Sequence, residues 1–107
     1  MKGNEMDIAK IITICGSLKF IDAIQRQAER LEFEGNCVLS ITYPTKAKDA
    51  YTEDELQLLG TLHKQKIALS DAIYVVNVDG YIGESTKNEI EYARTMGKEV
   101  LFLVDDY

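Results

Sequence analysis

Glu89 is the side chain of this sequence best placed to do chemistry. It follows Thr86 by three residues, near the start of a helical pattern that carries Ile90 and Ala93 and ends at Gly97. Two interpretations stay open. In a capping box, the carboxylate would bond the peptide group at the helix start and have no catalytic part. Alternatively, it lies one turn into a helix that points at a ligand, where it acts as a nucleophile or stabilises a positive sugar carbon.

Two loops could hold an anionic ligand near Glu89. In the first, Gly16 permits close approach, Ser17 offers a hydroxyl group, and Lys19 adds a cation. The second, residues 79–86, has two glycines followed by two hydroxyl side chains at a helix start, where free amide groups favour anions. The structural alternatives are a serine cap, a solvated lysine and a long turn.

His63 is the only histidine of the chain. It lies on the apolar stripe of a predicted helix. That stripe consists of Leu56, Leu59, His63 and Ile67. A lone histidine in this position is most often a buried, hydrogen-bonded core residue. Its ionisation near neutral pH also makes it a candidate proton carrier.

The composition is typical of one globular domain over residues 1–107, with 46% apolar and 28% charged residues. The net charge of −6 does not favour polymeric nucleic acid or an anionic membrane as a partner. We expect no membrane span and no secretory segment, because no apolar run approaches about 20 residues. Cys15 and Cys37 have no metal or redox spacing, which favours reduced, buried thiols in a cytoplasmic protein without a metal site.

Strand and helix patterns alternate along the whole chain. Apolar, β-branched runs predict strands at 11–14, 38–43, 72–76 and 100–104. The helix after the first run ends at Gly35, the next begins at Thr52 with a capping box to Glu55, and the last begins near Thr86. This order indicates an α/β domain.

Connection rules then predict the arrangement of the sheet. Strand–helix–strand crossovers are right-handed, which leaves few topologies. Among these we expect the doubly wound parallel sheet in the order 2-1-3-4, with the first helix on one face and the other two opposite. The two loops would meet where the winding reverses, which is where ligands bind in such sheets. One helix leaves part of its sheet face bare, which favours a homodimer.

Four segments resemble the 2′-deoxynucleoside 5′-phosphate N-hydrolases and the related nucleoside 2-deoxyribosyltransferases. They are residues 14–19, with Cys-Gly-Ser at the centre, 72–76, 89–93 and Gly97 with Lys98. The resemblance covers almost the whole chain in order and spacing. It implies a single flavodoxin-like (Rossmann-like) three-layer domain, a nucleoside or nucleotide as small-molecule partner, no cofactor, and a homodimer or larger assembly.

The resemblance also implies roles for residues. Glu89 would attack the anomeric carbon of a deoxyribosyl unit and release the base, by hydrolysis or by transfer. The phosphate and sugar contacts would fall on Gly16, Ser17, Leu18, Lys19, Gly83 and Ser85. His63 stands where the family has an aspartate that assists the nucleophile, so it would orient Glu89 or carry a proton. This departure, the altered second loop and the end at Tyr107 keep open an alternative, a nucleotide-binding module without catalysis.

Overall fold

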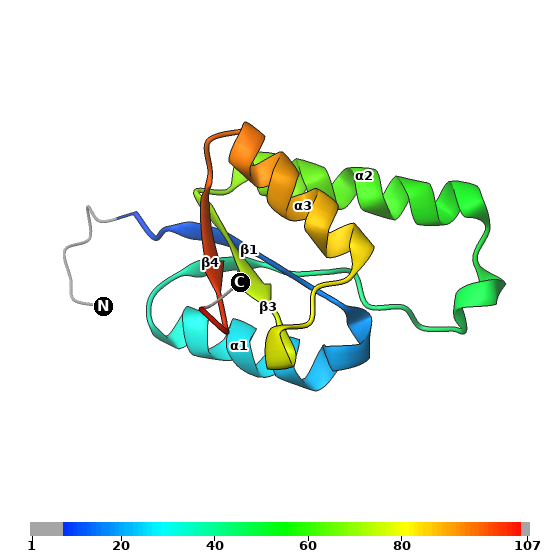
Figure 1. Cartoon of the computed structure of the whole chain (residues 1–107), viewed down its shortest axis with the longest axis horizontal. Coiled ribbons are helices and arrows are strands. Elements are labelled where there is room, and N and C mark those ends of the chain that lie inside the picture. Colours follow the sequence, from blue (N-terminus) through cyan, green and yellow to red (C-terminus); the bar gives the residue numbers. More distant parts are fainter. Residues whose placement is uncertain (1–7, 106–107) are drawn as a thin grey trace.

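A four-stranded parallel sheet forms the middle layer of the molecule (Figure 1). The computed structural model describes residues 8–105. The strands are β1 (Ile11–Gly16), β2 (Cys37–Leu39), β3 (Ala72–Val76) and β4 (Glu99–Phe102). They lie in the order β2-β1-β3-β4, and all neighbours are parallel. The predicted α/β class and strand order are confirmed.

Helices cover both faces of the sheet as predicted. Helix α1 (Ile21–Phe33) lies on one face, and α2 (Glu53–Leu69) and α3 (Glu84–Thr95) lie side by side on the other (Figure 1). The capping box at the start of α2 is confirmed, because the Thr52 and Glu55 side chains each accept a hydrogen bond from the other's backbone N–H, at 3.0 and 2.9 Å. None of the helices within residues 8–105 combines the length and apolar character needed to cross a membrane.

Strands β1 and β3 show alternate side chains to the two faces, because successive residues of a strand point in opposite directions. The side chains that point toward α1 are four aliphatic residues and one tyrosine, namely Ile12, Ile14, Ala72, Tyr74 and Val76. Toward α2 and α3, β3 presents Ile73 and Val75, whereas β1 presents Thr13 and Cys15. The second face therefore carries polar groups from the central strand.

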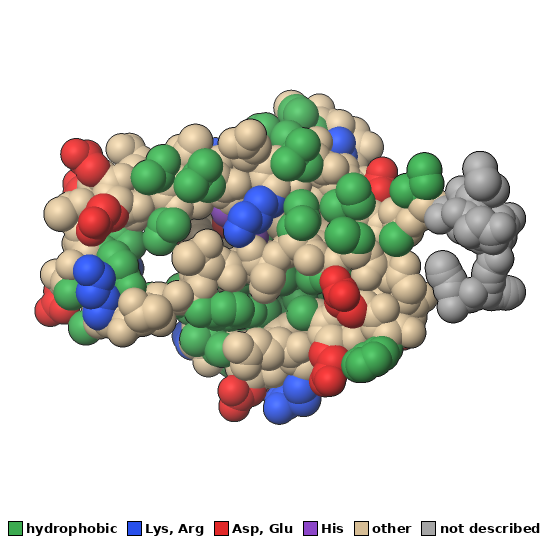
Figure 2. Space-filling view, turned by 180° about the vertical axis from the view of Figure 1, so that it is seen from behind, with side chains coloured by type: hydrophobic (Ala, Val, Ile, Leu, Met, Phe, Trp, Pro, Cys, Tyr) green, Lys and Arg blue, Asp and Glu red, His purple; other side chains and the backbone are tan. Residues whose placement is uncertain are grey.

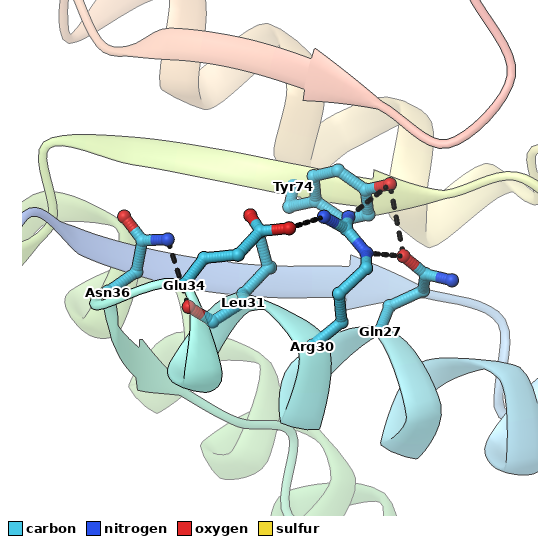
Figure 3. A network of polar contacts seen from close by, with 6 residues as sticks. All are labelled: Gln27, Arg30, Leu31, Glu34, Asn36 and Tyr74. Atoms are coloured by element: carbon cyan, nitrogen blue, oxygen red, sulfur yellow. Dashed lines mark hydrogen bonds and ion pairs between the residues drawn. The ribbon is translucent and has the colours of Figure 1, made fainter.

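The hydroxyl group of Tyr74 on β3 has hydrogen-bond partners on α1 (Figure 3). The Arg30 guanidinium donates to the Tyr74 hydroxyl oxygen at 3.1 Å, and that hydroxyl donates to Gln27 at 3.3 Å. Arg30 also donates to Gln27 at 3.0 Å and to Glu34 at 2.8 Å. Since a buried hydroxyl without partners destabilises a fold, this network holds α1 in place over β3.

The second strand differs from its prediction, because β2 ends at Leu39 although the alternating pattern ran over 38–43. The Ser40 carbonyl accepts a hydrogen bond from Lys66 Nζ at 2.7 Å, so it is diverted from the ladder. Ile41 and Tyr43 still pack against the α1-side core, which explains their alternation. Cys37, predicted to be buried, is exposed because it begins this short edge strand.

Candidate active site

A cavity of about 490 Å³ lies at the carboxyl end of β1 on the α2 side, within the size range of small-molecule sites. The strand order reverses between β1 and β3, as expected for a ligand site in such a sheet. The walls come from the first loop, the segment after β2, α2, and the start of α3. They consist of Gly16, Ser17, Leu18, Ile41, Thr42, Leu56, Leu59, Gly60, Leu62, His63, Lys66, Gly83, Glu84, Ser85, Thr86 and Glu89.

Every predicted site residue except Lys19 lines this cavity. The Lys19 ammonium instead lies 4.2 Å from the centre of the Tyr81 ring, in a cation–π contact. Tyr81 belongs to the second loop and also makes an edge contact with the Phe20 ring. Lys19 therefore helps to hold the two loops together from outside the cavity.

The first loop needs glycine for a packing reason that the sequence did not show. A Cβ atom on Gly16 would lie 3.2 Å from the Val76 carbonyl oxygen, which is a tight contact, so glycine favours the close approach of the ends of β1 and β3. Ser17 next to it caps a 3-10 turn, since its hydroxyl oxygen accepts from the Lys19 N–H at 3.3 Å. Ser17 thus caps a turn and lines the cavity at once.

The capping-box interpretation of Glu89 is wrong. Helix α3 begins at Glu84, and its first backbone bond runs from the Lys87 N–H to the Gly83 carbonyl oxygen at 3.0 Å. Glu89 is therefore well inside the helix, and Thr86 is buried rather than placed at the cap. The Glu89 side chain is only 18% exposed and lies in the cavity wall. The interpretation that places a carboxyl group at a ligand crevice is the one that the geometry supports.

Three side chains from three different elements meet beside the cavity. Cys15 Sγ from β1 lies 3.5 Å from His63 Nε2 of α2, and that nitrogen lies 3.9 Å from Glu89 Oε1 of α3. Cys15 is fully buried and His63 nearly so. The thiol has a single proton to donate, and either the imidazole nitrogen or the carboxylate can accept it.

Burial dominates the protonation of this cluster. It raises the pKa of Glu89 to about 7, although the Cys15 hydrogen bond and the Lys64 charge act in the opposite direction. It lowers the pKa of His63 to about 4, with a further contribution from the Lys66 charge. Burial, with the nearby Glu89 carboxylate, also raises the pKa of Cys15 well above its usual range. At neutral pH the thiol and imidazole are thus neutral, so His63 and Glu89 do not form an ion pair.

Two parts of the site were missed from the sequence. One is Lys66, a half-buried cation in the cavity wall, three residues after His63 on the same face of α2. Helical spacing from His63 would have found it. The other is the meeting of Cys15, His63 and Glu89, whose ligand atoms all lie within 4.8 Å of one another and could hold a metal ion. The prediction of no metal site rests on residue spacing along the chain. Residues 15, 63 and 89 are far apart in the sequence, so their spacing does not show that they meet in the fold.

Comparison with models of known protein families, with curated proteins and with solved structures finds no match to this chain.

Proposed function

We propose that this chain cleaves the N-glycosidic bond of a nucleoside or nucleoside 5′-monophosphate, with Glu89 as the nucleophile. One observation supports this best: the Glu89 carboxyl group is mostly buried, serves no cap, and lies in the wall of a cavity large enough for a nucleotide. A carboxyl group in such a place is costly to the fold, and groups with strongly perturbed pKa values gather at functional sites.

The reaction would proceed in two displacements. An ionised Glu89 oxygen forms a bond to the anomeric carbon while the bond from that carbon to the base breaks. The electron pair of the broken bond stays on the base nitrogen, which takes a proton from water. A second water molecule then attacks the anomeric carbon and gives its proton to the hydroxide left by the first, which frees the sugar and restores the carboxylate. If another base attacks in place of water, the result is transfer.

Neighbouring groups have supporting roles in this proposal. Neutral His63 would orient the carboxyl group of Glu89. Hydroxyl groups of Ser17 and Ser85 and backbone N–H groups of the two loops would hold phosphate and sugar oxygens. The apolar part of the wall, from Leu56 and Leu59, would pack against the base.

Release of free base tests this function. Deoxynucleosides and their 5′-monophosphates are incubated with the wild-type chain, Glu89→Gln and the matched control Glu91→Gln, and the base is measured by chromatography. Glu91 is exposed on the same helix, so its change should leave the rate unaltered. In Glu89→Gln the rate of base release should fall about 1,000-fold or more, as expected for loss of a nucleophile. Base release that survives in Glu89→Gln contradicts the proposal, and binding without any release indicates the non-catalytic nucleotide-binding alternative.

A homodimer in the cytoplasm is also part of this proposal. Hydrophobic side chains gather along the outer face of α2, in the upper half of the view from behind (Figure 2). Among them Leu58, Leu62 and Leu69 are 57%, 42% and 66% exposed. Exposed apolar surface of this kind favours association. Light scattering coupled to size-exclusion chromatography should give twice the chain mass of 12.1 kDa.

A further inference from the structure

Cys15, His63 and Glu89 have the spacing of ligands around one small cation. In a tetrahedral zinc site, a sulfur and a nitrogen ligand lie about 3.5 Å apart, given the usual bond lengths to zinc. The Cys15 Sγ and His63 Nε2 atoms are 3.5 Å apart, and His63 Nε2 and Glu89 Oε1 are 3.9 Å apart. All three ligand atoms lie within 4.8 Å of one another, so a small inward shift of Glu89 completes the set.

The three donors also match zinc in chemistry. A thiolate, an imidazole and a carboxylate together suit Zn²⁺, whereas Mg²⁺ and Ca²⁺ prefer oxygen ligands alone. When the ion binds, Cys15 releases its proton to the solvent. The resulting thiolate and the Glu89 carboxylate carry two negative charges, which balance the ion's two positive charges. A neutral assembly is the arrangement that a buried position tolerates best.

The ligands are carried by regular elements rather than by flexible loops. Cys15 lies on the central strand β1, in register with Val75 of β3. His63 lies inside α2, and Glu89 lies inside α3. Ligands on a rigid scaffold lose little freedom when a metal binds.

We propose that Cys15, His63 and Glu89 bind one Zn²⁺ ion, with the fourth coordination position open to the cavity. His63 and Glu89 line the cavity, so water or a ligand oxygen reaches that position. The inference goes beyond the proposed function and does not depend on it. If the chain also has the proposed function, zinc would occupy the Glu89 carboxylate and the ion would inhibit base release.

Cobalt spectroscopy of a single-thiol variant tests the site. Cys37→Ser leaves Cys15 as the only thiol, since the chain has two cysteines. Freed of metal with a chelator and then titrated with Co²⁺, this variant should show a thiolate-to-cobalt charge-transfer absorption that saturates at one equivalent. Zn²⁺ should abolish the absorption by competition. Absence of the absorption in Cys37→Ser overturns the proposal, and the test needs no change at the site itself.

Affinity measurements assign the other two ligands. Removal of His63 or Glu89, as His63→Gln and Glu89→Gln, should weaken zinc binding about 100-fold or more, because even partners outside the ligand set are worth 10–100-fold. Glu91→Gln is the matched control and should bind as the wild type does. Unchanged affinity in either ligand variant overturns the proposal. If metal-free protein binds zinc but releases no base, the proposed function fails and the zinc site stands. If it releases base but does not bind zinc, the zinc site fails and the proposed function stands.

Discussion

The two faces of the sheet are built from the same two central strands but differ in kind. On the α1 face, β1 contributes Ile12 and Ile14, and the one buried hydroxyl group, that of Tyr74, is satisfied by Arg30 and Gln27. On the α2/α3 face, β1 contributes Thr13 and Cys15 at the intervening positions. The first face is therefore mostly hydrophobic, whereas the second has a line of hydrogen-bonded polar groups under α2.

This difference separates stability from chemistry. The polar line on the α2/α3 face begins where Thr13 donates to the Lys66 carbonyl oxygen at 3.0 Å and contacts the Ser70 hydroxyl at 2.5 Å. It ends at Cys15, His63 and Glu89, where burial shifts all three pKa values against ionisation. A fold gains nothing from such a carboxyl group in itself, so this face is where we place function.

Matched core truncations should have the largest effect on stability. Ile24 on α1 and Ile67 on α2 are both fully buried. Each change to alanine should cost about 2–5 kcal/mol of unfolding free energy, through lost burial and a cavity. Urea denaturation measures this. Only Ile67→Ala, one turn from His63, should also weaken zinc binding. If Ile24→Ala disturbs the site equally, the two faces are not separate.

The pH dependence of stability should differ in sign between two variants of the metal-free protein. The folded-state pKa of Glu89 is raised from 4.5 to about 7. The stability that this shift contributes to the folded state is therefore fully present below pH 4.5 and is lost as pH rises through about 7. The folded-state pKa of His63 is lowered from 6.5 to about 4. The stability that this shift contributes is therefore fully present above pH 6.5 and is lost as pH falls through about 4.

Glu89→Gln should therefore be more stable than the wild type above pH 7, by on the order of 3 kcal/mol, and lose that advantage toward pH 4.5. His63→Gln should gain relative to the wild type as pH falls below 6.5. Denaturation at several pH values measures both, with Glu91→Gln as the control. Parallel pH profiles in the two variants would show that these groups are not buried together.

The network on the α1 face should give the smallest effect. Tyr74→Phe removes one hydroxyl group but leaves Arg30 bonded to Glu34 and Gln27. The expected loss is about 1 kcal/mol, the usual net value of a hydrogen bond. Zinc affinity and base release should be unchanged. A variant that keeps its stability but loses either property would break the division between the faces.

Much of the fold followed from local patterns. Runs of β-branched residues located the strands. The handedness of crossovers left few topologies, and the doubly wound order 2-1-3-4 predicted among them is the one observed. The end of β2 could not be predicted, because the bond from Lys66 to the Ser40 carbonyl joins residues far apart in the chain. The strand predicted at 100–104 is observed as Glu99–Phe102. It begins one residue earlier and ends two residues earlier than predicted.

The site shows where local reasoning reaches its limit. The capping-box pattern occurs twice, at Thr52 with Glu55 and at Thr86 with Glu89, and forms only at the first. At the second, α3 begins at Glu84 instead, so the pattern falls inside the helix. The sequence predicts only an ordinary buried thiol at Cys15, since nothing along the chain relates it to positions 63 and 89.

The pKa of Glu89 tests the central claim most directly. Carbon NMR of the side-chain carboxyl groups, recorded during a pH titration of metal-free protein, gives this value, and Glu89→Gln identifies its signal. We predict a midpoint of about 7, because the group is buried beside the cavity. A midpoint near 4.5, the ordinary value for glutamate, would contradict the account, since Glu89 would then be a solvated side chain without a place in a site.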